Sequence, residues 1–212
     1  ELIEKESGLP LDMFVDSLIF EPLGMSTTFY NPPEEKIKRV VPTEIDPKGN
    51  LIHGYVHDEN AHSLGGVAGH AGLFSTAKDL AIFSQMMLNR GLYGWKRIFK
   101  QETVDLFTTR ANLVFQSSRC LGWDSPSGAS SGGVYLSDVS YGHGGYTGTT
   151  LWIDPENETI VILLTNAVHP NRKNKDPKYF DWRHRIHSAV YESLSINVKN
   201  PSLSVRDRWT NN

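Results

Sequence analysis

The sequence has one cysteine, no long apolar run and no excess of basic charge, and each shortage excludes a class of protein. The single thiol, Cys120, excludes a disulfide within the chain but leaves the compartment open. No apolar run approaches the roughly 20 residues of a membrane-spanning helix. The 21 basic and 24 acidic residues give a net charge of −3 and form no basic stripe suited to nucleic acid. The 212 residues can still bury a sizeable single core.

The first eight residues have the pattern of the last turns of a helix. Apolar and charged residues share this stretch, and Gly8 stands where a left-handed C-terminal cap belongs. No initiator methionine and no N-cap residue precede it, so we expect a fragment of a larger domain, although a processed or cloned boundary would look the same. A second helix is expected from Leu11 and should end at Pro22.

The stretch from Tyr141 to Asn166 predicts a β-hairpin. Two runs of β-forming residues, 149–153 and 160–164, flank the turn formers of 154–157. The second run shows no polar alternation, so both of its faces should be covered, as in a central strand.

Four glycines surround His143 and Tyr146 just before this hairpin. Glycine in a strand marks a place where a ligand or another backbone approaches closely. An imidazole there can donate, accept or carry a proton near neutral pH. A glycine-rich loop with a surface histidine is the alternative, and the histidine alone does not exclude it.

The pattern G-H-G-G-Y-T-G-T, followed by W-I-D-P and I-V-I-L-L-T-N, resembles the third active-site motif of the β-lactamase-like serine hydrolases. These include class C β-lactamases, penicillin-recognising D-alanyl-D-alanine peptidases and related esterases. Their Lys-Thr-Gly triplet, often with histidine for lysine, lies on the strand beside the catalytic cleft. The matching triplet here is His143-Gly144-Gly145. Glycine in place of threonine removes a hydroxyl that often contacts a substrate carboxylate.

Two further stretches carry the same resemblance. S-G-L-P-L and E-P-L-G-M-S-T-T-F resemble the segment that follows the second active-site motif of the superfamily. V-H-D-E-N-A and L-G-G-V-A-G-H-A-G-L-F-S-T-A resemble a segment beside the cleft in one branch of it. This resemblance implies that His57, Asp58 and His70 line the cleft and bind substrate. The alternative is that they hydrogen-bond loop backbone.

A metal-dependent hydrolase is a further alternative, built on His53, His57 and His62. The His-x3-His spacing suits one face of a helix. The surrounding sequence is rich in turn formers, however, and a zinc site needs a defined tetrahedral ligand set. We therefore expect no metal and no other cofactor.

The segment Ser75-Thr76-Ala77-Lys78 matches the Ser-x-x-Lys nucleophile motif literally. Thr76 followed by Asp79 instead predicts the N-cap of a helix. On that helix Lys78 faces water, whereas a lysine that activates a serine must be held in a buried, charge-tuned site. We interpret this segment as a helix start.

The remaining elements complete an α/β (α+β) fold: a mostly antiparallel sheet flanked by helices, β-lactamase/transpeptidase-like and incomplete on its N-terminal side. A helix is expected at 101–109, a strand at 120–123 and a final helix at 179–194. Residues 1–196 would form the C-terminal part of the domain, and 197–212 a polar tail that we expect to be disordered.

Acyl transfer needs a nucleophile, a base and two oxyanion donors. The superfamily supplies the first two as Ser-x-x-Lys and the tyrosine of Tyr-x-Asn, and no Tyr-x-Asn occurs here. Ser195-Ile196-Asn197 fits Ser-x-Asn but falls in the tail. The resemblance therefore places the nucleophile upstream of Glu1. His143, the strand glycines and the backbone N–H of Tyr146 would form one wall of the cleft.

The resemblance implies a hydrolase that cleaves a β-lactam, a D-amino-acid peptide or an ester through an acyl-enzyme. Its partners would be a small-molecule or peptide substrate and the missing N-terminal part of the same domain. This chain alone would be inactive, and its strands would leave an unpaired edge. A non-catalytic, penicillin-binding-protein-like module is the alternative. Localisation stays open, although such proteins are often periplasmic or extracytoplasmic.

Overall fold

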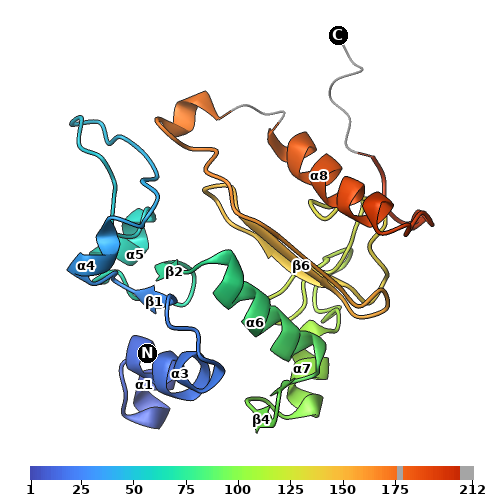
Figure 1. The fold of residues 1–212 in the computed structure, drawn as a ribbon, viewed down its shortest axis with the longest axis horizontal. Helices are drawn as coiled ribbons and strands as arrows, with labels where there is room; N and C mark the ends of the chain where they lie inside the picture. Colours follow the sequence, from blue (N-terminus) through green and yellow to red (C-terminus); the bar gives the residue numbers. More distant parts are fainter. Residues whose placement is uncertain (176–178, 206–212) are drawn as a thin grey trace.

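The structure is a computed structural model that describes residues 1–175 and 179–205. An antiparallel three-stranded sheet lies between two long helices, and a group of short helices and loops from the first third of the chain lies beside it (Figure 1). The helices are α1 (Leu2–Ser7), α2 (Leu11–Val15), η1 (Asp16–Phe20), α3 (Glu21–Leu23), α4 (Glu34–Ile37), α5 (Glu59–Ser63), α6 (Ala77–Leu88), α7 (Gln101–Thr108), η2 (Arg172–Asn174) and α8 (Tyr179–Ser193). None in the described ranges is long and apolar enough to span a membrane.

The sheet consists of β5 (Tyr141–Gly144), β6 (Thr150–Asp154) and β7 (Thr159–Leu163), in that order. Its register places Trp152 of β6 between Gly142 and Val161. The predicted hairpin is confirmed, and so is the cover on both faces of its second strand, but among the described strands that strand is not the central one. Strand β6 is central, and β7 pairs with β6 alone among the described strands. The apolar run of β7 has another cause, because α6 and α8 both pack against it.

The other strands of the described residues form two separate two-stranded sheets. They are β1 (Phe29–Tyr30) with β2 (Leu73–Phe74), and β3 (Leu92–Tyr93) with β4 (Lys96–Arg97). The strand expected at 120–123 is absent. The backbone N–H of Cys120 donates to the carbonyl of Trp123 at 2.8 Å and closes a turn. Only Asp124 joins the sheet, through two backbone hydrogen bonds with Gly142 of 2.8 and 2.9 Å.

The first N-terminal helix ends at its predicted glycine cap, but the second does not end at the predicted proline. Helix α1 ends at Gly8, which has a φ of 74° and donates to the carbonyl of Glu4. The chain does not end its second helix at Pro22. A π-helical turn at 16–20 shifts the hydrogen-bond pattern and places Pro22 in the first turn of the short helix α3. Proline is tolerated there, because a backbone N–H in the first turn has no partner within the helix. That helix ends instead at Gly24, with a φ of 72°.

Helix α6 begins as predicted and forms one side of the core. Met86 and Met87 pack with Ile153 of the sheet, while Lys78 is exposed. The Thr76 hydroxyl accepts from the backbone N–H of Asp79 at 3.3 Å.

Replacing Thr76 with alanine should lower the free energy of unfolding by about 1 kcal/mol, because α6 loses its N-cap. Thr76→Ser keeps the accepting oxygen and should stay within a few tenths of the wild type. Guanidinium unfolding curves measure both. Equal loss in the two variants would show that the methyl group, not the cap, is responsible.

Helices α7 and α8 confirm the helices predicted at 101–109 and 179–194, and each ends one residue earlier than predicted. The tail behaves differently from expectation as far as residue 205. Asn200 donates from its backbone to Val134 at 2.8 Å and from its side chain to Leu136 at 2.9 Å. This segment therefore packs on the body of the domain. Residues 206–212 of the predicted tail lie outside the described residues.

Candidate active site

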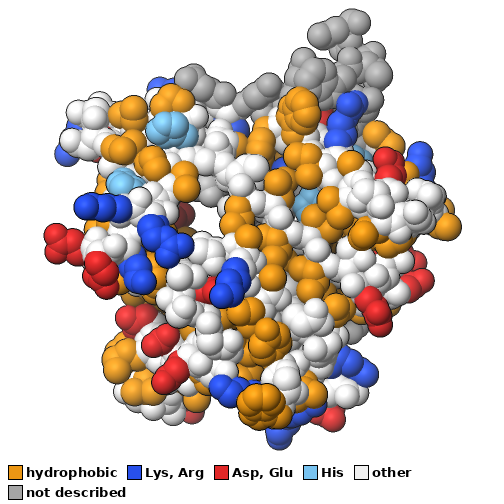
Figure 2. Space-filling model, viewed as in Figure 1, with side chains coloured by type: hydrophobic (Ala, Val, Ile, Leu, Met, Phe, Trp, Pro, Cys, Tyr) orange, Lys and Arg blue, Asp and Glu red, His pale blue; other side chains and the backbone are white. Residues whose placement is uncertain are grey.

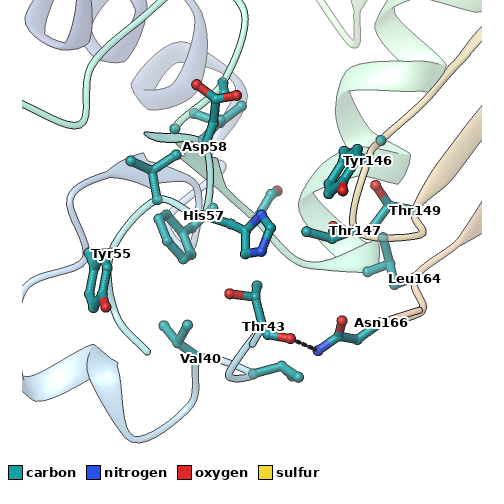
Figure 3. Close-up of a pocket in the computed structure, with 18 of the residues that line it drawn as sticks. Val40, Thr43, Tyr55, His57, Asp58, Tyr146, Thr147, Thr149, Leu164 and Asn166 are labelled. Atoms are coloured by element: carbon teal, nitrogen blue, oxygen red, sulfur yellow. Dashed lines mark hydrogen bonds between the residues drawn. The ribbon is translucent and has the colours of Figure 1, made fainter. Parts of the chain in front are cut away.

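A cavity of about 800 Å³ lies between the loops of residues 36–76 and the end of the sheet. The face in Figure 2 is hollowed there, and Figure 3 shows the two walls with their side chains. The backbone carbonyl of Thr43 accepts from the Asn166 amide at 3.2 Å and ties one wall to the other. Five of the predicted site residues line this cavity: His57, Asp58, His70, Gly145 and Tyr146.

The side chains of His57 and Tyr146, which both line the cavity, contact each other. Their rings are stacked, with centroids 5.7 Å apart and planes 24° from parallel. The Nε2 atom of His57 also lies 2.8 Å from a carboxylate oxygen of Glu44. The carboxylate orients the imidazole, and the imidazole in turn limits where the Tyr146 ring can lie.

Glu44 is the centre of a buried charged network. It is only 5% exposed and accepts from the backbone N–H and the Nε of Arg172, both at 2.7 Å. Arg172 also donates to Glu59 at 2.7 Å. Burial raises the pKa of Glu44, but the hydrogen bonds from Arg172 and His57 outweigh it and hold that pKa below its ordinary value. Hydrogen bonds to Glu44 and Glu59 raise the pKa of Arg172.

Glu44→Gln should lower the free energy of unfolding by about 1–2 kcal/mol, because the Arg172 guanidinium loses its anionic acceptor. Glu35→Gln on the exposed surface of α4 is the matched control and should change little. Chemical unfolding at pH 7 measures both. Equal values for the two variants would mean that the Glu44 network contributes no net stability.

Asp58 and His70 form a second pair on the same wall. Asp58 accepts from the backbone N–H of Ala61 at 2.8 Å and lies 3.0 Å from Nε2 of His70. The Ala61 hydrogen bond and then His70 lower the pKa of Asp58. Asp58 thus caps α5 while it lines the cavity, so it makes the backbone hydrogen bond of the second interpretation, and substrate binding by Asp58 stays a prediction.

The turn after β5 brings backbone to the cavity. The N–H of Gly145 donates to Thr149 at 2.7 Å, and an alanine Cβ at Gly145 would lie 2.4 Å from the Thr149 hydroxyl. Lys175 donates to the carbonyl of Tyr146 at 2.7 Å. No acceptor within the described ranges takes the backbone N–H of Tyr146. An unpaired N–H beside a cavity is the kind of donor that an oxyanion needs.

His143 and Gly144 lie outside the cavity lining, in contrast to the other predicted site residues. His143 is exposed on β5, and its Nε2 lies 3.0 Å from a guanidinium nitrogen of Arg119. A Cβ at Gly144 would lie 3.1 Å from Arg183 of α8, so the missing side chain would face that helix. The two residues are neighbours on β5 and therefore face opposite sides of the sheet: Gly144 faces α8, and His143 faces Arg119.

The three histidines of the metal hypothesis have separate partners. His53 lies 2.8 Å from the carbonyl of Val40, His57 pairs with Glu44, and His62 packs against the ring of Tyr55. Within the described part of the chain, no group of three His, Cys, Asp or Glu side chains is placed to hold a metal ion. The metal-dependent alternative therefore lacks a ligand set there.

The Ser75–Lys78 segment is placed as a helix start. The hydroxyl of Ser75 lies 2.7 Å from that of Thr28, and Lys78 is exposed. This serine and lysine thus lack the buried partnership that activates a nucleophile.

Sequence reasoning missed Glu44, Arg172 and Arg119. Glu44 and Arg172 lie 128 residues apart, and Arg119 and His143 lie 24 apart. No short motif joins the members of either pair. The one available signal was local: Glu44 follows Pro42 and Thr43 in a turn-rich stretch that also contains His57.

The antiparallel sheet, the His-Gly-Gly triplet at the end of its first strand and the cavity that begins at Gly145 fit a β-lactamase-like serine hydrolase domain. The chain belongs to this family, because the family model described as Beta-lactamase matches residues 1–185. Among curated proteins, "Putative D-alanyl-D-alanine carboxypeptidase" of Escherichia coli K12 is 37% identical over 200 residues, covering 85% of this chain and 46% of that protein. A Salmonella newport protein of the same name is 38% identical over 186 residues, covering 79% and 43%.

Solved structures show the same fold at low identity. A variant of simvastatin synthase from Aspergillus terreus superposes with a TM-score of 0.67 and 20% identity, covering 92% of this chain and 54% of that one. A penicillin-binding protein homologue from Caulobacter crescentus gives 0.63 and 17%, covering 91% and 55%. The chain spans about half the length of the curated relatives that it matches.

Proposed function

We propose that this chain is the C-terminal part of a serine hydrolase domain that cleaves an amide or ester through an acyl-enzyme. The nucleophilic serine and its base would come from residues outside this chain. The observation that carries the proposal is the turn after β5, where Gly145 permits close approach and the N–H of Tyr146 lacks an acceptor among the described residues. Family membership supports the reaction class.

The chemistry follows from where charge develops. The serine oxygen adds to the substrate carbonyl carbon and gives its proton to the base, and the N–H of Tyr146 donates to the carbonyl oxygen as it becomes negative. The C–N or C–O bond then breaks, and the leaving group takes that proton from the protonated base. Water attacks the acyl-enzyme and releases the second product. Loss of one oxyanion donor typically costs about 10²–10³ in rate.

A D-amino-acid peptide is the substrate we favour. The curated relatives are named for D-alanyl-D-alanine carboxypeptidase activity, and the cavity of about 800 Å³ is large enough for a peptide segment. A β-lactam or a simple ester would use the same donor and cleft.

A fluorophosphonate probe tests the proposal. We expect it to label the full-length protein, also when Ser75 is replaced by alanine, and to leave the isolated 212-residue chain unlabelled. Labelling at Ser75 would overturn our assignment of the nucleophile. A full-length protein that takes no label but still binds a D-amino-acid peptide would favour the non-catalytic binding module.

A further inference from the structure

Arg119 lies beside the edge of β5 that does not pair with β6. It ends the loop of residues 111–119, and a backbone hydrogen bond joins the two ends of that loop. The backbone N–H of Ala111 donates to the carbonyl of Arg119 at 2.9 Å, and Arg119 and Asp124 form an antiparallel bridge. Asp124 in turn exchanges both of its backbone hydrogen bonds with Gly142 of β5. This chain of backbone pairs places Arg119 near His143, although Arg119 lies in a surface loop.

The guanidinium is held on two sides. Its Nη1 atom lies 3.1 Å from a carboxylate oxygen of Asp124 and 3.0 Å from Nε2 of His143. A guanidinium carries only donors and stays protonated at any pH that a protein meets. Nε2 of His143 must therefore accept in this contact. An imidazole nitrogen accepts only when it bears no proton, so the one proton of a neutral ring lies on Nδ1.

We propose that Arg119 is a positioning residue that holds His143 as the neutral Nδ1–H tautomer. His143 then offers a hydrogen-bond donor at the edge of β5, rather than a base or a cation. Asp124 offsets the charge of Arg119, so the three side chains together carry no net charge. His143 lies outside the cavity lining but two residues before Gly145, which is part of it. A substrate that extends from the cavity past Gly145 along β5 would offer this donor a carbonyl or hydroxyl oxygen. The tautomer assignment stands on geometry alone, and its use in catalysis rests on the proposed function.

Nitrogen NMR of the imidazole rings tests the assignment directly. Long-range proton–nitrogen spectra of the full-length protein, with ¹⁵N-labelled histidine and at pH 7.5, distinguish Nδ1–H, Nε2–H and doubly protonated rings. His143→Gln identifies the signal of His143. We expect the Nδ1–H pattern in the wild type and a shift toward Nε2–H in Arg119→Met, because methionine has no N–H to donate to Nε2. Arg119→Lys, which keeps a cationic donor, should restore at least part of the Nδ1–H population.

Lys48→Gln is the matched control, since it removes one exposed cation that contacts neither residue. It should leave the His143 signal unchanged. A wild-type His143 that is doubly protonated or Nε2–H at pH 7.5 would overturn the proposal, and so would an unaltered tautomer in Arg119→Met. The side chain of Arg119 is 61% exposed, so unfolding should not obscure the result, and thermal melting verifies this.

Kinetics form a separate arm. With 4-nitrophenyl acetate and the full-length protein, Arg119→Met should lower kcat by about tenfold, the effect of one lost hydrogen bond, with KM little changed. Arg119→Lys should recover most of the loss. An unaltered kcat with an altered tautomer would limit Arg119 to orienting the ring and overturn its use in catalysis. A full-length protein without hydrolysis or probe labelling would refute the proposed function, while the NMR arm would still decide the tautomer.

Discussion

Asp154→Ala is expected to lower the free energy of unfolding by about 3–5 kcal/mol, because it leaves one buried and several half-buried donors without their acceptor. The Asp154 carboxylate is fully buried at the end of β6. It accepts from the Tyr191 hydroxyl at 2.9 Å and from the Ser137 hydroxyl and N–H at 2.6 and 3.1 Å. The Asn157 amide donates to it at 2.8 Å. One side chain therefore joins the hairpin turn, helix α8 and the chain before β5.

Two variants separate this network from the turn itself. Asp154→Asn keeps the shape and part of the accepting capacity, and should cost less than the alanine variant. Glu156→Ala, in the same turn but exposed, should stay within about 0.5 kcal/mol of the wild type. Urea unfolding followed by circular dichroism gives all three values. If Asp154→Ala lowered the free energy of unfolding by less than about 1 kcal/mol, the hydrogen bonds of this carboxylate would not be what holds the turn, α8 and the chain before β5 together.

Acidification from pH 7 to pH 4 is expected to cost about 3 kcal/mol of stability through His187 alone. This imidazole is fully buried, with Nε2 2.8 Å from the Thr150 hydroxyl and no described partner for Nδ1. Burial, and then the nearby charges of Arg183 and His184, lower its pKa from 6.5 to about 4. Between these values the unfolded chain binds the proton and the folded one does not. The contribution is therefore complete above pH 6.5 and is lost progressively as the pH falls toward 4.

His187→Gln tests this assignment. The variant should lose absolute stability at pH 7, yet its stability should change less between pH 7 and pH 4.5 than that of the wild type. His62→Gln, at a histidine on the exposed surface, is the control and should keep the wild-type slope. Guanidinium midpoints across this pH range provide the measurement. Identical slopes for wild type and His187→Gln would show that other groups cause the acid sensitivity.

Local patterns predicted the elements that depend on neighbouring residues. The αL cap at Gly8, the Thr76 cap of α6 and the two β-forming runs of the hairpin are each decided within a few residues. Predictions that needed a distant partner were less accurate. The run at 160–164 looked central because both faces are apolar, but helices cover those faces, and β6 holds the middle position. Residues 120–123 look β-forming, yet only Asp124 reaches β5.

The candidate site divides in the same way. Resemblance alone selected His57, Asp58, His70, Gly145 and Tyr146, which the structure gathers around one cavity. It also selected His143 and Gly144, which lie outside the lining of that cavity, His143 beside Arg119 and Gly144 beside Arg183.

The sequence by itself determined the family, the helix caps and the hairpin, because these depend on side-chain periodicity and on hydrogen bonds between near neighbours. Only the tertiary structure decided that Glu44 meets Arg172 across 128 residues and that Arg119 meets His143. Such contacts arise when the chain packs, since burial of the apolar faces brings distant loops together. No local pattern records which loops will meet.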